Sequence, residues 1–474
     1  MITFFSCVAL LIFGYFFYSK FVEKILKIDP KKLTPAYKMQ DGIDYIPISK
    51  PKNALINLLN IAGTGPVFGP ILAALYGPVA MLWIVLGCIF AGAVHDFVIG
   101  IISLRNNGET LPTLAEKYLS KFFKHIVNFF SALLLILVAT VFVVGPAKLI
   151  IGLADFLNFY VVIAVLFFYY FLATLMPIDK IIGKIYPFFG ALLLISAFCI
   201  MVSVIFFMGK PLPELNLQNM HPQNLPIYPL LFLVLSCGAL SGFHATQIPI
   251  VARTIENQNQ ARSIFYGMMI LEGIVALIWT YATIVMFDGK TLLELIKIGT
   301  PSLVVDKLAI MTLGSYVGTL AILGVIVLPV TSGATAFRGI RLMLAEYLNL
   351  KQKKIFNRLV IAIPCFLVSL GLCFVDFQLL WQYFSWANQT LAAITLWIAT
   401  IYLIKTKKNM WITLIPALFI TSVVITYILY APIGFGVAID VSAAFAVLCC
   451  IILFLSVYRF YKNNLNVENI GEDL

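Results

Sequence analysis

Charged residues are scarce in this chain of 474 residues: Asp, Glu, Lys and Arg make up only 11%, whereas hydrophobic residues make up 62%. The mean hydropathy is accordingly +1.01. Almost no polar segment is long enough to form a separate soluble domain, and apolar runs that can cross about 30 Å of hydrocarbon recur from end to end. The composition therefore excludes a water-soluble protein. It predicts one integral membrane domain over residues 1–474, with the lipid bilayer as its surroundings.

Motifs of enzyme chemistry are also missing. The chain has no H-E-x-x-H helix, no G-x-S-x-G turn and no Walker lysine loop. Its eight cysteines lack C-x-x-C spacing, so they indicate neither a disulfide framework nor a zinc site. We therefore expect no enzyme activity and no cofactor. The net charge of +11 fits the lysine and arginine excess of polytopic membrane proteins, so it does not indicate a nucleic acid partner.

Hydropathy predicts an all-α fold of about 13 transmembrane helices. The expected spans are residues 2–19, 54–75, 79–103, 126–150, 159–176, 186–208, 228–250, 263–287, 308–330, 357–375, 378–404, 411–430 and 439–458. All but five of the 32 Lys and Arg residues then fall on one side of the membrane. The five exceptions are Lys148, Lys210, Lys290, Lys297 and Lys307. The positive-inside rule therefore predicts an N-terminus outside and a C-terminus in the cytoplasm.

Two of the predicted spans contain residues that break helices. The first break is expected in the segment Asn60-Ile-Ala-Gly-Thr-Gly-Pro-Val-Phe-Gly-Pro70, and the second in Leu240-Ser-Gly-Phe-His-Ala-Thr-Gln-Ile-Pro249. Backbone groups freed at membrane depth are tolerated only where protein or a water-filled cavity satisfies them. Paired breaks in two halves of a chain are the sequence indication of a transporter's substrate site. Glycine and proline clusters that only allow close helix packing are the alternative.

The two breaks lie five spans apart and run in opposite directions. This spacing predicts a LeuT-like five-plus-five inverted repeat, with a first repeat over 54–208 and a second over 228–404. An extra N-terminal helix and cytoplasmic loop (1–53) precede the repeats. Extra C-terminal helices and a cytoplasmic tail (411–474) follow them.

Five ordered segments resemble the carbon starvation protein A (CstA) family. They are Ala62-Gly-Thr-Gly-Pro66, Ala91-Gly-Ala-Val-His-Asp-Phe97, Leu240-Ser-Gly-Phe-His-Ala-Thr-Gln247 with Ala252-Arg-Thr254, Leu328-Pro-Val-Thr-Ser-Gly333 with Thr335-Ala-Phe-Arg338, and Tyr383-Phe-Ser-Trp-Ala-Asn-Gln-Thr-Leu391. The resemblance implies a secondary transporter of the inner (plasma) membrane, from the amino acid/polyamine/cation superfamily. It also implies uptake of peptides or pyruvate under carbon limitation. The chain departs from the family at His95, where glutamine is frequent.

Polar groups at the breaks are the candidate ligands of a small-molecule substrate. The half-helix that starts near Val67 should present free amides and a positive dipole end, which attract carboxylates. The candidate substrate-binding residues are Gly63, Thr64, Gly65, Ser241, Gly242, His244 and Gln247. His244 has the alternative of a hydrogen-bonded core histidine. Asn388 and Gln389 either line the pathway or bridge helices.

Ionisable residues inside the spans are candidates for ion coupling, because burying a charge in a membrane is costly. Glu272 and Asp96 are the candidate proton carriers, and His95 adjoins Asp96. A structural salt bridge of Asp96 with Arg105 or Arg338 is the alternative. The hydroxyls of Thr331 and Ser332, with the carbonyls of Ala62 and Gly63, form a possible Na⁺ site, since oxygen ligands suit a hard cation.

These observations predict a secondary active transporter that imports short peptides or a carboxylate such as pyruvate, with H⁺ as the coupling ion. A Na⁺-coupled transporter of the same substrates is one alternative. A transporter-like nutrient sensor is another, although the tail after Tyr458 offers no output module. The oligomeric state is left open.

Overall fold

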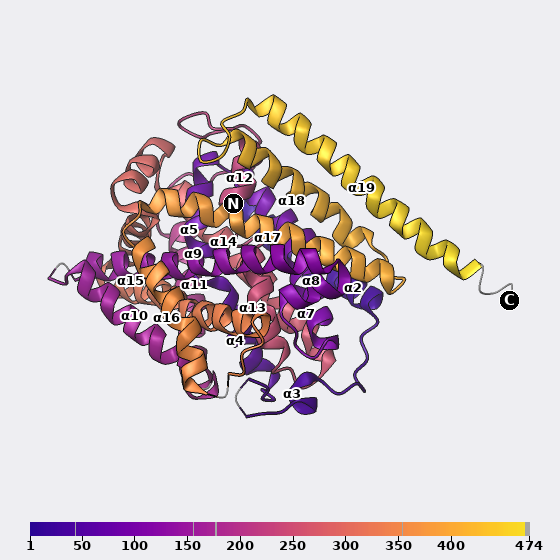
Figure 1. Cartoon of the computed structure of the whole chain (residues 1–474). Helices are drawn as coiled ribbons and strands as arrows, with labels where there is room; N and C mark the ends of the chain where they lie inside the picture. Colours follow the sequence, from indigo (N-terminus) through magenta and orange to yellow (C-terminus); the bar gives the residue numbers. More distant parts are fainter. Residues whose placement is uncertain (43, 155, 176–177, 353, 470–474) are drawn as a thin grey trace.

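A computed structural model shows the architecture for residues 1–469, apart from 43, 155, 176–177 and 353; within helices, the side chains of 175–189 and 465–469 are also not described. In this described part the chain is helical, with an isolated β-bridge between Ile48 and Ile255. Figure 1 shows one bundle of long helices, with α18 (Trp411–Tyr430) and α19 (Ile439–Asn469) along one edge. The predicted all-α membrane fold is confirmed at this level.

Helical segments occur at every predicted span. Nine in the described residues are long and apolar enough to cross a membrane, or up to ten if the bent pair α4 and α5 counts as one. The nine are α1 with α2 (Ile2–Leu26), α6 with α7 (Val79–Arg105), α9 (Lys121–Leu153), α14 with its preceding turns (Gln258–Met286), α15 (Gly289–Tyr347), α16 (Ile355–Leu372), α17 (Phe377–Lys405), α18 and α19. Shorter apolar segments lie in α10 (Phe159–Leu175) and α11 (Ile178–Phe206). The number of membrane crossings stays a prediction.

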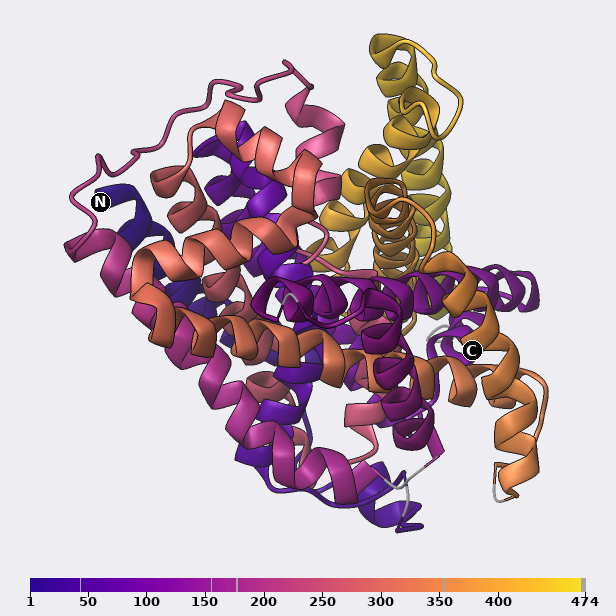
Figure 2. The same cartoon turned by 90° about the vertical axis from the view of Figure 1, so that its left-hand side faces the viewer.

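The long helix α15 departs from the predicted span at 308–330. Its backbone is non-helical at Thr300 and at Gly314, where φ is +63° and +73°. A Cβ on Gly318 would lie 2.8 Å from the carbonyl oxygen of Ala309, so the chain folds back on itself around Gly314. The prediction of one continuous span over 308–330 is therefore wrong in its first part, because the chain reverses direction at Gly314, a glycine with positive φ. Figure 2 shows α15 crossing α11, against which it packs.

The loops gather into two opposite faces. On the first, the guanidinium of Arg105 donates to the carbonyls of Leu26 and Lys27, and the ammonium of Lys405 donates to the carbonyl of Tyr118. We call this the lysine-rich face, since most predicted basic loops meet there. On the second, the side chain of Lys210 donates to the carbonyl of Met286. The orientation of these two faces in the membrane stays a prediction.

Candidate functional site

The first break separates α4 (Lys50–Ala62) from α5 (Gly65–Ala73), and the axes of the two halves differ by 46°. Gly63 has φ +50° and ψ −144°, which side chains other than glycine rarely adopt. α5 begins at Gly65 rather than near Val67, and the Val67 amide donates to the carbonyl of Thr64 at 3.2 Å. The prediction of free amides at Val67 is therefore wrong, because Thr64 caps the helix through its backbone.

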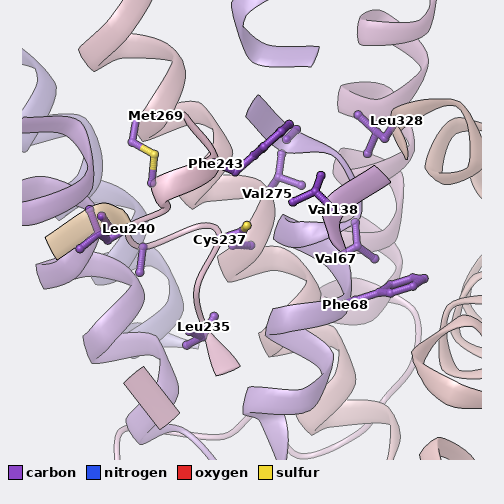
Figure 3. Packing of buried hydrophobic residues seen from close by; sticks show 14 of the residues in the cluster. Val67, Phe68, Val138, Leu235, Cys237, Leu240, Phe243, Met269, Val275 and Leu328 are labelled. Carbon is purple, nitrogen blue, oxygen red and sulfur yellow. The ribbon is translucent and has the colours of Figure 1, made fainter. Parts of the chain in front are cut away.

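The second break is longer and lies mostly before the residues predicted. α12 (Ile227–Val234) ends seven residues before α13 (Gly242–Ala252), with Ser241 as its extended N-cap residue. The irregular segment passes directly over the first break: a Cβ on Gly65 would lie 2.2 Å from the Cβ of Cys237. Figure 3 shows Leu235, Cys237 and Leu240 on this segment, beside the helix that carries Val67 and Phe68.

Asn388 and Gln389, both on α17, hold the backbone of the second break. The Asn388 Oδ1 accepts from the Phe243 amide at 2.7 Å, and its Nδ2 donates to the Ser236 carbonyl at 3.0 Å. The Gln389 Nε2 donates to the carbonyls of Phe232 and Leu240, both at 3.2 Å. Both side chains are completely buried. Both side chains thus bridge helices and satisfy backbone groups freed by the break, and a role in lining the pathway stays a prediction.

A buried chain of ionisable side chains links three helices beside the breaks. On α7 (Ala93–Arg105), Asp96 accepts one contact from each of two histidines: Oδ1 lies 2.8 Å from His95 Nδ1, and Oδ2 lies 2.9 Å from His244 Nδ1. The other His244 nitrogen, Nε2, lies 3.4 Å from Oε2 of Glu272 on α14 (Gly267–Met286). We call Asp96, His244 and Glu272 the relay. Each of its side chains is at most 1% exposed.

The relay bears on two of the alternatives left open by the sequence. A salt bridge of Asp96 with Arg105 or Arg338 was the alternative to a proton-carrying role, but Arg105 donates to the Tyr402 hydroxyl and Arg338 donates to the carbonyl of Ala173. His244, predicted either as a substrate ligand or as a hydrogen-bonded core histidine, places its two ring nitrogens against two carboxyl groups. Sequence reasoning named all three residues and missed that they form one unit. The scarcity of histidine, four in the chain, was the signal that could have linked them.

Several buried polar atoms near the breaks have no hydrogen-bond partner within the described part of the chain. They include Thr64 Oγ1, Asn60 Oδ1, Gln247 Oε1 and, within the second break itself, Ser236 Oγ. All four side chains are at most 1% exposed. Such atoms are costly to bury, so they mark positions where a bound molecule can contribute the missing contact. Thr64 and Gln247 were predicted from the sequence. Asn60 was missed, although Asn53, Asn57 and Asn60 recur at helical spacing along α4.

The hydroxyls proposed for Na⁺ are engaged with backbone carbonyls. Ser332 Oγ donates to the carbonyl of Leu59 at 2.5 Å, and Thr331 Oγ1 donates to that of Leu328 at 2.7 Å. The bond between Ser332 and Leu59 brings α15 against α4, as the predicted Na⁺ site requires. It lies one helical turn before Ala62 and Gly63, whose carbonyls were the predicted ligands. Across the described residues, no group of three or more His, Cys, Asp or Glu side chains is arranged to hold a metal ion.

Two hollows flank the breaks on opposite faces. A cavity of about 400 Å³, which we call the large cavity, lies on the face opposite the lysine-rich one and reaches Leu72 of α5 and Val234 of α12. A crevice of about 20 Å³, with room for about one water molecule, lies on the lysine-rich side, between Arg253, Ser131 and Gly339. The break residues themselves are buried between the two hollows.

A bundle of apolar helices with two facing breaks, a buried ionisable relay and a hollow on either side defines a membrane transporter. The comparisons give the family. The sequence model described as "Carbon starvation protein CstA" matches residues 1–151, 150–304 and 289–427. The chain therefore belongs to the CstA family, as its motifs predicted.

The similar proteins include an uncharacterized membrane protein and two named transporters. An uncharacterized membrane protein of Haemophilus influenzae is 46% identical over 346 residues, 62% of this chain and 93% of that one. In Escherichia coli K12, the peptide transporter CstA is 27% identical over 57% of this chain and 48% of its own length. The pyruvate/proton symporter BtsT of the same organism is 25% identical over 60% of this chain and 49% of its own. The match thus spans about half the length of these two transporters.

Solved structures share the fold at much lower identity. A manganese transporter of Eremococcus coleocola, crystallised as a mutant with one glutamate changed to glutamine, superposes with a TM-score of 0.60 and 12% identity, over 90% of this chain and 99% of that one. A second mutant of the same transporter, with one histidine changed to alanine, gives a TM-score of 0.59 over 88% and 94%. At this identity the likeness shows the fold alone.

Proposed function

We propose that this protein is a secondary active transporter that imports short peptides or a small carboxylate such as pyruvate, driven by protons, when carbon is limiting. The observation that carries the proposal is the relay, which puts an imidazole between two carboxyl groups at the second break. The names of the E. coli relatives support the two substrate classes. Nothing about the chain's substrate depends on the manganese transporters.

The relay is suited to carry a proton because its three ionisable groups lie next to one another, buried between three helices. His244 Nδ1 lies 2.9 Å from Asp96, whereas Nε2 lies 3.4 Å from Glu272 without a hydrogen bond, so a small approach of Glu272 completes a path for a proton through the ring. The three groups belong to α7, α13 and α14, so any movement between these helices changes the distances. A buried charge that lost its partner would cost several kcal/mol, roughly 3–5 by comparison with other proteins. Protonation and helix movement are thereby coupled.

The five-plus-five inverted repeat of the LeuT-like folds is part of the proposal. In it, α4/α5 open the first repeat and α12/α13 open the second, within the amino acid/polyamine/cation superfamily. Two features support this reading. Each expected first helix is broken, and the two breaks lie face to face, at the separation set by Gly65 and Cys237.

The orientation of the protein in the membrane is proposed from the distribution of its Lys and Arg residues. We propose that the lysine-rich face is cytoplasmic in the inner membrane, that the N-terminus lies outside, and that the large cavity opens outward. A cytoplasmic closure then holds the small crevice shut: Arg253 Nε donates to the Gly108 carbonyl at 2.9 Å, and its Nη2 lies 3.7 Å from Oε2 of Glu346. Glu346 also accepts from the hydroxyl of Thr110 at 3.0 Å. An introduced cysteine near Pro213 should react with an impermeant thiol reagent on intact cells, whereas one in residues 27–42 should not.

Transport is tested with purified protein in proteoliposomes and labelled pyruvate or dialanine. Accumulation is measured under an inward proton gradient without Na⁺, and then under a Na⁺ gradient with a protonophore. We expect the proton gradient alone to drive accumulation. Accumulation that requires Na⁺ and ignores the proton gradient would refute proton coupling and direct attention to Thr331 and Ser332. An absence of uptake of both compounds under either gradient would refute the substrate classes.

The relay is tested with isosteric variants in the same vesicles. Glu272→Gln mimics the neutral acid, so it should keep exchange of substrate across the membrane and lose accumulation against a gradient. Asp96→Asn should do the same. Glu294→Gln is the matched control, because Glu294 is an exposed acid outside the relay. Normal accumulation by both relay variants would contradict the proposed role.

A further inference from the structure

The large cavity has the size and lining of a binding site for a small molecule. Its volume of about 400 Å³ lies within the usual range for ligand pockets, about 300–1,000 Å³. Its wall is mostly apolar, with leucines from α5 and α12 and the rings of Tyr427 and Tyr430 from the end of α18. A mostly apolar wall with a few polar groups is the usual form of such sites, since the polar groups select the ligand.

Two buried donors line this cavity without a partner. On α17, the indole Nε1 of Trp381 and the hydroxyl of Ser385 make no hydrogen bond within the part of the chain that the structure describes. The residues are 5% and 1% exposed. Buried indole N–H and hydroxyl groups normally find partners, and leaving one unpaired costs about 1–3 kcal/mol. Four residues apart, they lie one above the other on the same face of the helix. Both residues line the cavity, and their donor atoms are buried in its wall.

The remaining polar groups indicate an acceptor with negative charge. Lys297 contributes an ammonium, and no acidic residue occurs among the described residues of the lining. The ring of His221 packs against that of Tyr76 at a tilt of 51°, with centroids 4.8 Å apart, and its Nδ1 accepts from the Gln223 amide at 3.2 Å. With Nδ1 used as acceptor, the ring's N–H lies at Nε2. Burial lowers the pKa of His221, so the ring serves as a neutral donor.

The same helix connects the cavity to the second break. Residues 381, 385 and 388 follow one face of α17 at helical spacing, and Asn388 clamps the break. We propose that the large cavity is an access site, in which Trp381 and Ser385 bind the carboxylate of the transported molecule before it reaches the breaks. The proposal rests on the function proposed above and adds a second site to it. It predicts binding determinants outside the break residues.

The test measures equilibrium binding of labelled pyruvate and of labelled dialanine to the purified full-length protein in detergent. Trp381→Phe and Ser385→Ala each remove one donor, and we expect each to weaken binding about tenfold, as for a lost hydrogen bond to a charged group. Trp386→Phe is the matched control: its Nε1 also lacks a described partner, but it does not line the cavity. Ser385→Thr keeps the hydroxyl and should restore binding. Unlabelled dialanine should displace the label, and dialanine amide should not.

Uptake provides the second readout. For an access site, Trp381→Phe and Ser385→Ala should raise the KM for uptake about tenfold and leave the maximal rate near that of the wild type. Wild-type binding by both variants would overturn the proposal, and so would equal displacement by dialanine amide. Binding of neither compound by the wild type would overturn the assignment to carboxylates. If vesicles show no driven transport but binding still depends on Trp381 and Ser385, the access site stands and the proposed function fails.

Discussion

The two broken helices differ in how their freed backbone is held. The second break spans seven residues, and Asn388 and Gln389 satisfy its carbonyls and an amide with side chains. The first break spans only Gly63 and Thr64, and the Thr64 hydroxyl beside it has no partner in the described structure. The long break is thus clamped by side chains from α17, whereas no such clamp is seen at the short one; unpaired polar atoms remain at both, Ser236 Oγ among them at the long break. We infer that the second break maintains the architecture, and we expect the first one to contact the substrate.

The largest expected effect comes from removing the clamp. Asn388→Leu leaves the Phe243 amide and the Ser236 carbonyl buried and unpaired, at about 1–3 kcal/mol each. We expect a large fall in the amount of folded protein and in its unfolding temperature in detergent. Thr390→Val is the control, since the Thr390 hydroxyl bonds to Trp386 in its own helix. Wild-type thermal stability of Asn388→Leu would remove the distinction between the breaks.

The second largest effect is expected at the close contact between the two breaks, where Gly65 packs against Cys237. Gly65→Leu should abolish uptake and leave the protein in the membrane, because its side chain must displace Cys237 from the other break. Gly65→Ala already places a Cβ 2.2 Å from that of Cys237, so it should lose most uptake. Adding Cys237→Gly makes room, and the double variant should recover part of the rate. Failure of this rescue with normal protein levels would show that the contact with Cys237 is not what limits uptake.

Much of this architecture was predictable from local patterns. Apolar runs indicated the helices, and the glycine–proline cluster at 63–70 located the first break. The second break lies earlier in the chain than predicted. Its irregular segment, 235–241, is mostly apolar in sequence, and side chains from α17 satisfy its backbone groups. The relay was not predictable as a unit, since its contacts join residues 148 positions apart, between Asp96 and His244. Such pairings depend on helix packing, which hydropathy does not record.

A smaller effect is expected at the unpaired hydroxyl of the first break. Thr64→Val keeps the shape of the side chain and removes the donor. If this hydroxyl contacts the substrate, the KM for uptake should rise several-fold while the unfolding temperature stays unchanged. Thr64→Ser should behave like the wild type. Loss in Thr64→Ser with normal uptake by Thr64→Val would instead point to packing of the Thr64 methyl group, which lies 3.4 Å from the Cβ position of Gly145.

The smallest effect is expected at the far end of α13, where the second break connects to the lysine-rich face. Glu346→Gln keeps an acceptor for Thr110 and loses the ion pair with Arg253, which spans 3.7 Å at a partly exposed position. Such pairs contribute about 0–1 kcal/mol. We expect exchange rates to change less than about fivefold, measured in vesicles without a gradient. A complete loss of exchange would show that this contact controls opening rather than merely favouring closure.

The relay also has consequences for the membrane potential. With both carboxyl groups ionised and the imidazole protonated, its formal charge is −1, and one additional proton brings it to zero. A carrier that takes up one proton with a monocarboxylate therefore moves no net charge, whereas the same carrier loaded with a zwitterionic dipeptide moves one positive charge inward. Each such charge is worth about 2.3 kcal/mol per 100 mV. Currents recorded from reconstituted membranes would therefore distinguish the two kinds of cargo: the peptide would depolarise the membrane and pyruvate would be electrically silent.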